Sequence, residues 1–211
     1  MAKLSVEEII LRGARHRAQR LAYDELKRLK VCYWDIESSN LDADFGLILC
    51  AGIKTLGVPG IRIYRIDESP EYAKKPWDDS WVAKRIRDDL EQHNVIVHHY
   101  GDRFDVPFLN TRLIGHRARL LDSTRMCFVD TWLNVRKRLK LHSNRLNSLI
   151  AHLDTKTNKT GLDGHLWVKA LAGHKPSLDA VVKHNLNDIR ALEEVATELA
   201  KFYNLRYTYV K

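Results

Sequence analysis

Apolar residues form short runs broken by turn residues, and later in the chain they form stripes at helical spacing. The short runs are rich in Val, Ile, Leu and aromatic residues and predict strands rather than helices. These strands are expected at Val31–Ser38, Gly46–Lys54, Gly60–Asp67, Val95–Tyr100 and Phe128–Asp130. Turn residues at 57–60 separate the second strand from the third, which favours an antiparallel meander of the first three strands.

The stripes predict helices between and after these strands. They are expected at Asp78–His93, Asp105–Leu113, Thr131–Leu139, Arg145–Leu153, Leu166–Ala172 and Ser177–Tyr203. The polar segment Thr155–Gly164 predicts a loop. A meander, then alternating helices and strands, then helices indicate an α/β fold of three layers, with a mixed five-stranded sheet flanked by helices.

The first part of the chain, residues 1–30, predicts a basic helical extension, and residues 31–211 predict the main domain. Ser5–Leu29 has a partial apolar stripe, and Ser5 with Glu8 has the spacing of a helix-capping box. We expect this helix to pack on the domain, with phosphate contacts as the alternative role.

Positive charge is concentrated in two stretches of a chain with a net charge of +8 and a pI of about 9.4. Residues 112–145 contain nine Lys or Arg against two acidic residues, and residues 1–30 contain eight against four. Charge focused in this way indicates a polyanionic partner such as nucleic acid. The alternative is that these residues are solvated helix faces.

The three cysteines, Cys32, Cys50 and Cys127, lack a metal-binding spacing, and the first two lie in apolar runs. They predict reduced thiols. No apolar run reaches the roughly 18–20 residues of a membrane span, and no signal-peptide pattern opens the chain. We therefore expect a cytoplasmic protein without a membrane partner.

Two carboxylates stand at the end of the first predicted strand. Asp35 and Glu37 are two residues apart, so they project from the same side of the strand while Ile36 points back into packing. Like charges this close favour a divalent cation or a basic partner. The pair alone also fits a solvated strand end.

Further acidic residues stand where a metal site could gather them. Asp105 follows the fourth predicted strand and begins a helix, and Asp188 lies in the last helix. His184 precedes Asp188 by one helical turn, so the two residues share a face. An ordinary helix pair has the same spacing, so the pair of His184 and Asp188 indicates a metal site only in combination with the other acidic residues.

Taken together, these motifs resemble the DEDD (DnaQ-like) superfamily of 3′–5′ exonucleases, whose members have the RNase H-like fold. Asp35-Ile36-Glu37 corresponds to the first motif, Asp105 to the second and Asp188 to the third. The resemblance covers about residues 31–203. It is strongest to the branch that contains the stand-alone predicted RNase H-like exonucleases and the exonuclease domains of family B polymerases.

Three positions depart from that family pattern. This branch usually has tyrosine four residues before the last Asp, where the chain has His184. The histidine-type branch has its histidine five residues before, where Lys183 stands. The second motif often has Asn before its Gly, and here Tyr100 precedes Gly101. The metal-binding residues thus match the family, whereas the water-orienting residue and the subfamily do not follow from it.

The resemblance implies a two-metal-ion mechanism with Mg²⁺ or Mn²⁺ held by Asp35, Glu37, Asp105 and Asp188. Asp35 would bridge both ions, Glu37 and Asp188 would bind one of them, and Asp105 would reach the second mainly through water. Two divalent ions about 3.5–4 Å apart would generate a hydroxide and neutralise charge on the leaving oxygen. His184 would orient or deprotonate the attacking water.

Four residues are candidates for substrate contacts. Leu41 falls where relatives place an apolar residue against the terminal base. Tyr100 and Phe104 flank the second motif and predict stacking on bases, with core packing as the alternative. Arg112 opens the basic stretch and predicts a contact with the nucleic-acid backbone.

Three other polar residues predict structural roles. His98 and His99 are consecutive in a strand, so one faces each side, and we interpret both as supporting residues. Asp130 precedes Thr131 and predicts a helix cap rather than a metal ligand.

These features predict a metal-dependent 3′–5′ exonuclease that acts on single-stranded or frayed 3′ ends, with DNA favoured over RNA. The length leaves no room for a polymerase or helicase domain, so a replication or repair partner would act in trans. The alternatives are an RNase H-like endonuclease or structure-specific nuclease, and a non-catalytic nucleic-acid-binding module. Four intact carboxylates disfavour the binding module, because they repel phosphates.

Overall fold

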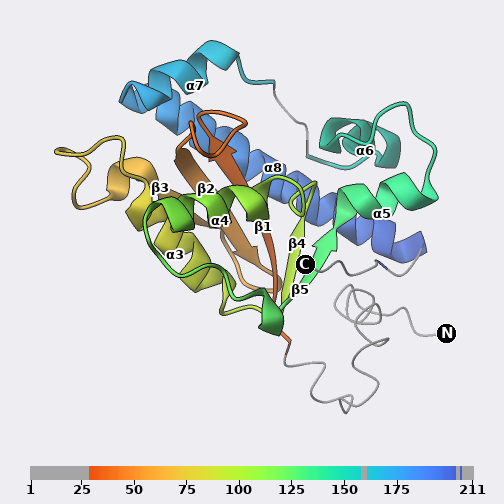
Figure 1. The fold of residues 1–211 in the computed structure, drawn as a ribbon. Coiled ribbons are helices and arrows are strands. Elements are labelled where there is room, and N and C mark those ends of the chain that lie inside the picture. The colour runs from red at the N-terminus through yellow and green to blue at the C-terminus, as the bar shows by residue number, and fades with distance from the viewer. Residues whose placement is uncertain (1–28, 158–160, 203–204, 206–211) are drawn as a thin grey trace.

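The structure is a computed structural model that describes residues 29–157, 161–202 and 205 (Figure 1). The helix expected at Ser5–Leu29 lies outside the described residues, except for its last residue. The described part of the chain is an α/β domain in which helices cover both faces of one sheet.

The sheet has five strands in the order β3-β2-β1-β4-β5. Their bounds are Val31–Ser38 for β1, Ile48–Thr55 for β2, Arg62–Arg65 for β3, Val95–His98 for β4 and Cys127–Asp130 for β5. Strands β1, β2 and β3 pair antiparallel, whereas β4 and β5 run parallel to β1. The predicted mixed sheet and its meander are therefore confirmed.

The helices form the two outer layers. Their bounds are Ser80–Leu90 for α3, Asp105–Gly115 for α4, Thr131–Arg138 for α5, Leu146–Leu153 for α6, Gly164–Leu171 for α7 and Lys175–Phe202 for α8. Figure 1 shows α3 and α4 on one face of the sheet and the long α8 across the other. Short 3₁₀ turns lie at Ile66–Glu68 and Ser123–Arg125. None of the helices in the described ranges is long and apolar enough to cross a membrane.

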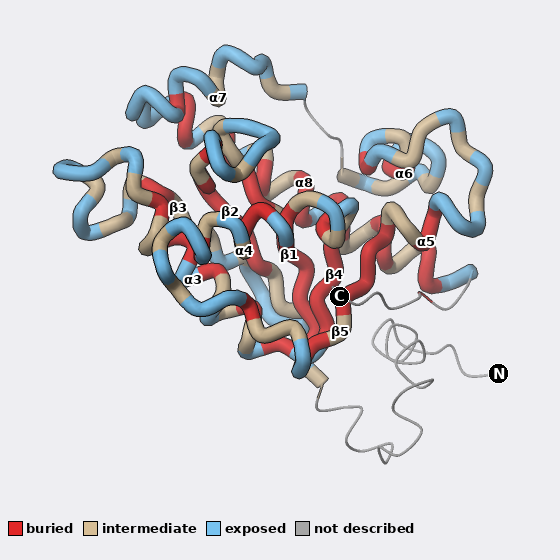
Figure 2. Tube along the Cα trace, viewed as in Figure 1, coloured by how far each residue is buried: buried red, intermediate tan, exposed pale blue. Residues whose placement is uncertain are grey.

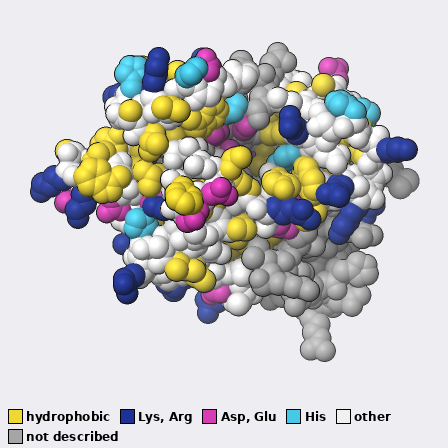
Figure 3. All heavy atoms as spheres, turned by 45° about the horizontal axis from the view of Figure 1, so that its top comes forward, with side chains coloured by type: hydrophobic (Ala, Val, Ile, Leu, Met, Phe, Trp, Pro, Cys, Tyr) yellow, Lys and Arg dark blue, Asp and Glu magenta, His cyan; other side chains and the backbone are white. Residues whose placement is uncertain are grey.

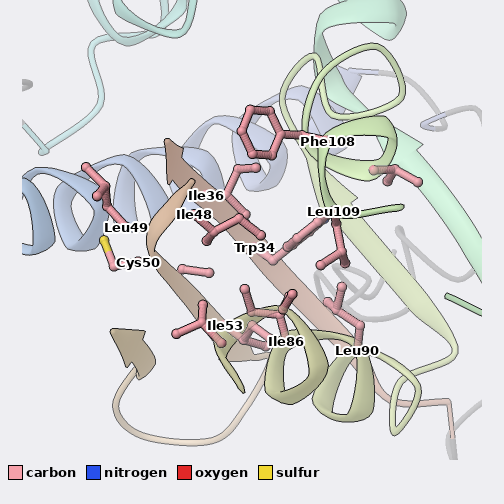
Figure 4. Packing of buried hydrophobic residues seen from close by; sticks show 14 of the residues in the cluster. Trp34, Ile36, Ile48, Leu49, Cys50, Ile53, Ile86, Leu90, Phe108 and Leu109 are labelled. Carbon is pink, nitrogen blue, oxygen red and sulfur yellow. The ribbon is translucent and has the colours of Figure 1, made fainter. Parts of the chain in front are cut away.

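The apolar core lies on both sides of the sheet, whose strands are largely buried except for the edge strand β3 (Figure 2). Trp34 and Ile36 pack with residues of α3 and α4, as Figure 4 shows. Tyr33, one residue along the strand, packs instead with Leu192 and Val195 of α8. This alternation follows from the two-residue period of a strand, and it turns Asp35 and Glu37 toward α8.

Most element boundaries differ from the prediction by one to three residues, and two of these differences have identifiable reasons. Helix α3 begins at Ser80 rather than Asp78, because the Asp79 carboxylate turns inward and accepts a hydrogen bond from the Ile48 backbone N–H at 2.8 Å. Strand β4 ends at His98 rather than Tyr100, because Tyr100 has a left-handed backbone with φ of 69°. Both deviations come from side chains and turns that serve the region around the site.

The predicted helix cap and the predicted free thiols are confirmed. Asp130 is the N-cap of α5, and its carboxylate accepts hydrogen bonds from the backbone N–H groups of Trp132 and Leu133 at 2.9 and 3.2 Å. Cys32 and Cys50 are buried free thiols.

Candidate metal centre

The carboxylates of β1 lie where this strand meets α8. Glu37 is buried and Asp35 is half-buried. On the neighbouring strand β2, Gly52 is the partner of Asp35 and Cys50 is the partner of Glu37. Burial raises the pKa of the Cys50 thiol, and the charges of Glu37 and Asp35 raise it further, so this thiol stays neutral beside the acidic pair.

Helix α8 presents His184 and Asp188 toward Glu37. The Nε2 atom of His184 lies 3.8 Å from Oδ2 of Asp188 and 4.0 Å from Oε1 of Glu37. These distances are too long for direct hydrogen bonds and leave space between the three groups. Sequence spacing predicted that His184 and Asp188 share a face, and the structure brings that face to the end of β1.

The donor set at this point fits a divalent cation. Ligand atoms of Glu37, His184 and Asp188 all lie within 4.8 Å of one another. Two of the three groups are carboxylates, whose hard oxygen ligands suit Mg²⁺ or Mn²⁺. His184 lies close enough to both carboxylates to contact an ion or a water molecule bound there.

Asp35 is held in place by a residue that the sequence analysis did not single out. The side-chain amide of Asn185 donates hydrogen bonds to Oδ2 of Asp35 at 2.8 Å and to its backbone carbonyl at 3.1 Å. Asn185 is fully buried, and a Cβ atom at Gly52 would come within 2.6 Å of its Oδ1 and within 2.2 Å of Cδ1 of Ile189. Gly52 is therefore required for α8 to approach the sheet at the site.

Asp105 approaches β1 from the side of β4. Its Oδ1 accepts a hydrogen bond from the backbone N–H of Ile36 at 3.1 Å, so its carboxylate lies beside the backbone segment that joins Asp35 to Glu37. Burial raises the pKa of Asp105 from 3.8 to about 6, and the nearby His98 and the Ile36 N–H oppose this shift. A nearby cation would compensate this buried charge, because an opposite charge favours the ionised form.

A second cluster, His98, Asp102 and Asp130, has ligand atoms within 4.8 Å of one another. The indole N–H of Trp34 donates to Nδ1 of His98 at 3.3 Å, so Nε2 carries the proton that bonds Asp102 at 2.9 Å. Asp130 accepts four backbone N–H groups, two in α5 and those of Tyr100 and Asp102. Hydrogen bonds thus account for the cluster, which agrees with the supporting role predicted for His98.

His184 has an aromatic neighbour that sequence reasoning also missed. The indole of Trp167 in α7 meets the imidazole edge-on, with ring centroids 5.8 Å apart. No spacing motif links these residues, because they lie on different helices. Asn185, in contrast, stands three residues before Asp188, so its place on the site face of α8 could have been read from helical periodicity.

The predicted substrate residues are spread over the loops around the site. Leu41 is 81% exposed in the loop between β1 and β2. Tyr100 is exposed beside Trp132, and the two rings meet edge-on with centroids 4.9 Å apart. Phe104 is half-buried against the core and contacts the Phe108 ring, with centroids 5.5 Å apart. Leu41 and Tyr100 are accessible to a substrate, whereas Phe104 contributes to packing.

Arg112 requires a correction, because its guanidinium is held within the protein. It forms hydrogen bonds with the fully buried Asp79 carboxylate, at 2.8 Å from Nη2, and with the backbone carbonyl of Ala43, at 3.1 Å from Nη1. His116 contacts the same carboxylate at 2.6 Å. We therefore assign Arg112 a structural role in supporting the loop between β1 and β2. Its charge in the sequence gave no sign of this buried partner.

Comparisons with known proteins agree with the predicted fold. The family model of the RNase H superfamily matches residues 32–200. The family B DNA polymerase from the hyperthermophilic archaeon Pyrobaculum calidifontis superposes with a TM-score of 0.64 and 18% identity, over 81% of this chain and 24% of the polymerase. This chain thus spans about a quarter of the polymerase, and at that identity the likeness shows the fold alone. No curated protein sequence matches.

Proposed function

The chain belongs to the RNase H superfamily, and on this basis we propose that it is a metal-dependent nuclease, specifically a 3′–5′ exonuclease. The observation that supports this most is the position of Glu37, His184 and Asp188 around one space at the end of β1. Asp35 lies two residues before Glu37, and Asp105 bonds the backbone between them. The DEDD motifs therefore converge in three dimensions.

In the proposed site, Asp35, Glu37, Asp105 and Asp188 would hold two ions, Mg²⁺ or Mn²⁺. Bound divalent ions supply a hydroxide nucleophile at neutral pH and neutralise charge on the phosphate. Asn185 fixes the orientation of Asp35 through its two hydrogen bonds. His184, with Nε2 directed between two carboxylates, orients the attacking water and accepts its proton.

The proposed substrate is a single-stranded or frayed 3′ end, with DNA favoured over RNA. The exposed Leu41 and Tyr100 provide apolar and aromatic surface near the site for unstacked bases. We include a cytoplasmic location in the proposal, because buried free thiols suit a reducing compartment. The proposal also includes a replication or repair protein as a partner that acts in trans.

Digestion of end-labelled nucleic acids tests the proposal directly. Single-stranded and duplex DNA and RNA, labelled at either end, are incubated with Mg²⁺, with Mn²⁺ or with EDTA. Stepwise shortening from the 3′ end that requires metal and is lost in Asp35→Ala is the expected result. Cleavage of circular single-stranded DNA would instead favour the endonuclease alternative. Binding without any cleavage would favour the non-catalytic module.

A further inference from the structure

A group of aromatic and basic side chains lies at the start of α5, outside the carboxylate site. The guanidinium of Arg103 is 5.5 Å from the centroid of the Trp132 ring, and that of Arg136 is 5.0 Å from it. Tyr100 meets the same indole edge-on at 4.9 Å. We call these four residues the Trp132 patch. Both arginines and Tyr100 are exposed, and Trp132 is half-buried.

The charge of this patch is not compensated by acidic side chains of the described residues. Two guanidinium groups on one indole repel each other, and no described carboxylate forms an ion pair with Arg103 or Arg136. Lys137 and Lys140 nearby on the chain are also exposed. Figure 3 shows Lys and Arg side chains gathered on the side of the molecule that carries α5 and α6. An anionic partner would relieve this repulsion.

One buried carboxylate holds the two halves of the patch together. Asp130 caps α5 through the N–H of Trp132 and also accepts the N–H of Tyr100 at 3.0 Å. Tyr100 has a left-handed backbone, with φ of 69°. Residues other than Gly, Asn and Asp seldom adopt this conformation. The backbone N–H groups of Tyr100 and Trp132 share the Asp130 carboxylate as acceptor, so the backbone that carries both rings is anchored without a ligand.

The chemistry of the patch matches a nucleic-acid strand. A guanidinium stacked on an aromatic ring keeps its N–H edge available, and this edge suits the two oxygens of a phosphate. The exposed Tyr100 offers aromatic surface for a base.

We propose that the Trp132 patch binds the phosphodiester backbone of a single strand whose end occupies the carboxylate site. This inference rests on the proposed nuclease function for the identity of the site. The carboxyl ends of β1, β4 and β5 lie at the same edge of the sheet, because these strands are parallel. Adjacent strands are about 4.8 Å apart, which places the patch on the order of 10 Å from β1. A strand whose end occupies the carboxylate site would therefore reach the patch with an upstream part of its backbone.

The test measures binding of labelled single-stranded oligonucleotides of two to ten nucleotides to the full chain, in EDTA, across a range of salt concentrations. The variants are Arg103→Gln, Arg136→Gln and the double variant. Arg85→Gln is the matched control, because Arg85 is exposed and lies over the Trp81 ring at 5.4 Å on α3. Circular dichroism and thermal melting verify that each variant is folded.

Each patch variant should weaken binding of the longer oligonucleotides by about 5-fold at 0.1 M salt, because one single-strand phosphate contact contributes a log–log salt slope of about 0.7. The double variant should lose about 25-fold and reduce the slope by about 1.4. The affinity for dinucleotides should fall less than the affinity for longer oligonucleotides, because a dinucleotide is too short to reach the patch. Arg85→Gln should bind with the affinity and salt slope of the wild type.

Two outcomes separate this inference from the proposed function. If the wild type cleaves nucleic acid but the patch variants bind with the affinity and salt slope of Arg85→Gln, the inference is overturned and the nuclease proposal stands. If binding depends on both arginines but no cleavage occurs with any metal, the inference stands and the nuclease proposal fails. Failure of the wild type to bind any oligonucleotide overturns the inference.

Discussion

Asn185 donates its side-chain amide to both the carboxylate and the backbone carbonyl of Asp35, at 2.8 and 3.1 Å. The donor stands on α8 three residues before Asp188, so one helix both orients the first acidic residue and supplies the last. The geometry of the site therefore depends on how α8 docks on β1.

Replacing Asn185 tests this dependence. Asn185→Ala should lower kcat by about 10- to 100-fold, the range seen when a residue that orients a metal ligand is lost. It should also destabilise the fold by about 1–3 kcal/mol, because the Asp35 carbonyl loses its donor in a buried place. Asn187→Ala, on the same helix but with its amide oxygen bonded to Arg190, is the control. Unchanged turnover in Asn185→Ala would remove its positioning role.

The four carboxylates should be needed for cleavage but not for folding. Asp35→Ala and Asp188→Ala should abolish activity and leave the Tm in EDTA equal to or slightly above that of the wild type, because each removes charge from a crowded acidic site. The Tm increase on adding Mg²⁺ or Mn²⁺ should also be reduced. The exposed Asp44 in the β1–β2 loop provides the control Asp44→Asn. Normal turnover in Asp35→Ala would contradict the two-metal assignment.

The buried Asp105 should make the metal-free protein less stable as the pH rises. This carboxyl has a pKa of 3.8 when unfolded and about 6 when folded, so between these values the folded chain binds more protons. The contribution of Asp105 to the free energy of unfolding is therefore fully present below about pH 4 and is lost as the pH rises through about 6. At neutral pH the wild type is less stable by about 3 kcal/mol than it would be without this shift. Urea unfolding in EDTA from pH 4 to 8 measures this dependence.

Asp105→Asn should remove that cost, because an amide stays neutral and its oxygen can still accept from the Ile36 N–H. The free energy of unfolding of the variant should be equal to or lower than that of the wild type at pH 4 and higher at pH 8. The stability of the control Asp44→Asn should change with pH as that of the wild type does. A wild-type stability that rises from pH 4 to 6 in parallel with Asp105→Asn would contradict the raised pKa.

Arg112 distinguishes a structural role from substrate binding. Its partner Asp79 is fully buried, so Arg112→Ala should destabilise the fold by about 3 kcal/mol, because the carboxylate loses its guanidinium partner and keeps only His116 and the Ile48 N–H. Arg119→Ala, which breaks the exposed ion pair with Glu91, should cause a much smaller loss of Tm. A raised KM with an unchanged Tm in Arg112→Ala would instead support the role predicted from the sequence.

His184 should act on the chemical step rather than on binding. His184→Ala should reduce kcat by about 10²–10⁴-fold, the usual range for loss of general acid–base catalysis, with little change in KM. Turnover should fall on the acid side of the profile, because a protonated imidazole cannot accept the water proton. His184→Tyr should recover part of the rate and flatten this fall, because a phenol can orient water without titrating there. Near-normal turnover in His184→Ala would leave water activation to the metals alone.

Much of the fold follows from local sequence patterns. Each strand and helix predicted within the described residues is present, because apolar period and turn residues agree with the tertiary packing at almost every position. Boundaries shifted by one to three residues at most elements, and the start of α3 shows one cause, a side chain with a distant partner. Asp79 would cap α3 by local rules, but its carboxylate bonds Ile48 and Arg112 instead.

The site was predictable where the motif residues lie close in sequence and less so elsewhere. The spacing of Asp35 and Glu37, and of His184 and Asp188, determined which side chains share a face. Asn185 and Trp167 were missed, since an amide and an indole carry no charge pattern and their partners are on other elements. The internal partner of Arg112 could not be predicted, because net charge shows an excess of arginines but does not tell which of them are paired internally.

The bond between Asp35 and Asn185 joins residues 150 positions apart, which has a consequence for when the candidate site forms. During synthesis, the sheet strands leave the ribosome before α8, and closing so long a loop is slow. A nascent chain that has formed β1 but not yet docked α8 lacks Asp188 and holds Asp35 unoriented. Under the proposed function, the site that would cut nucleic acid is therefore completed only after α8 is in place.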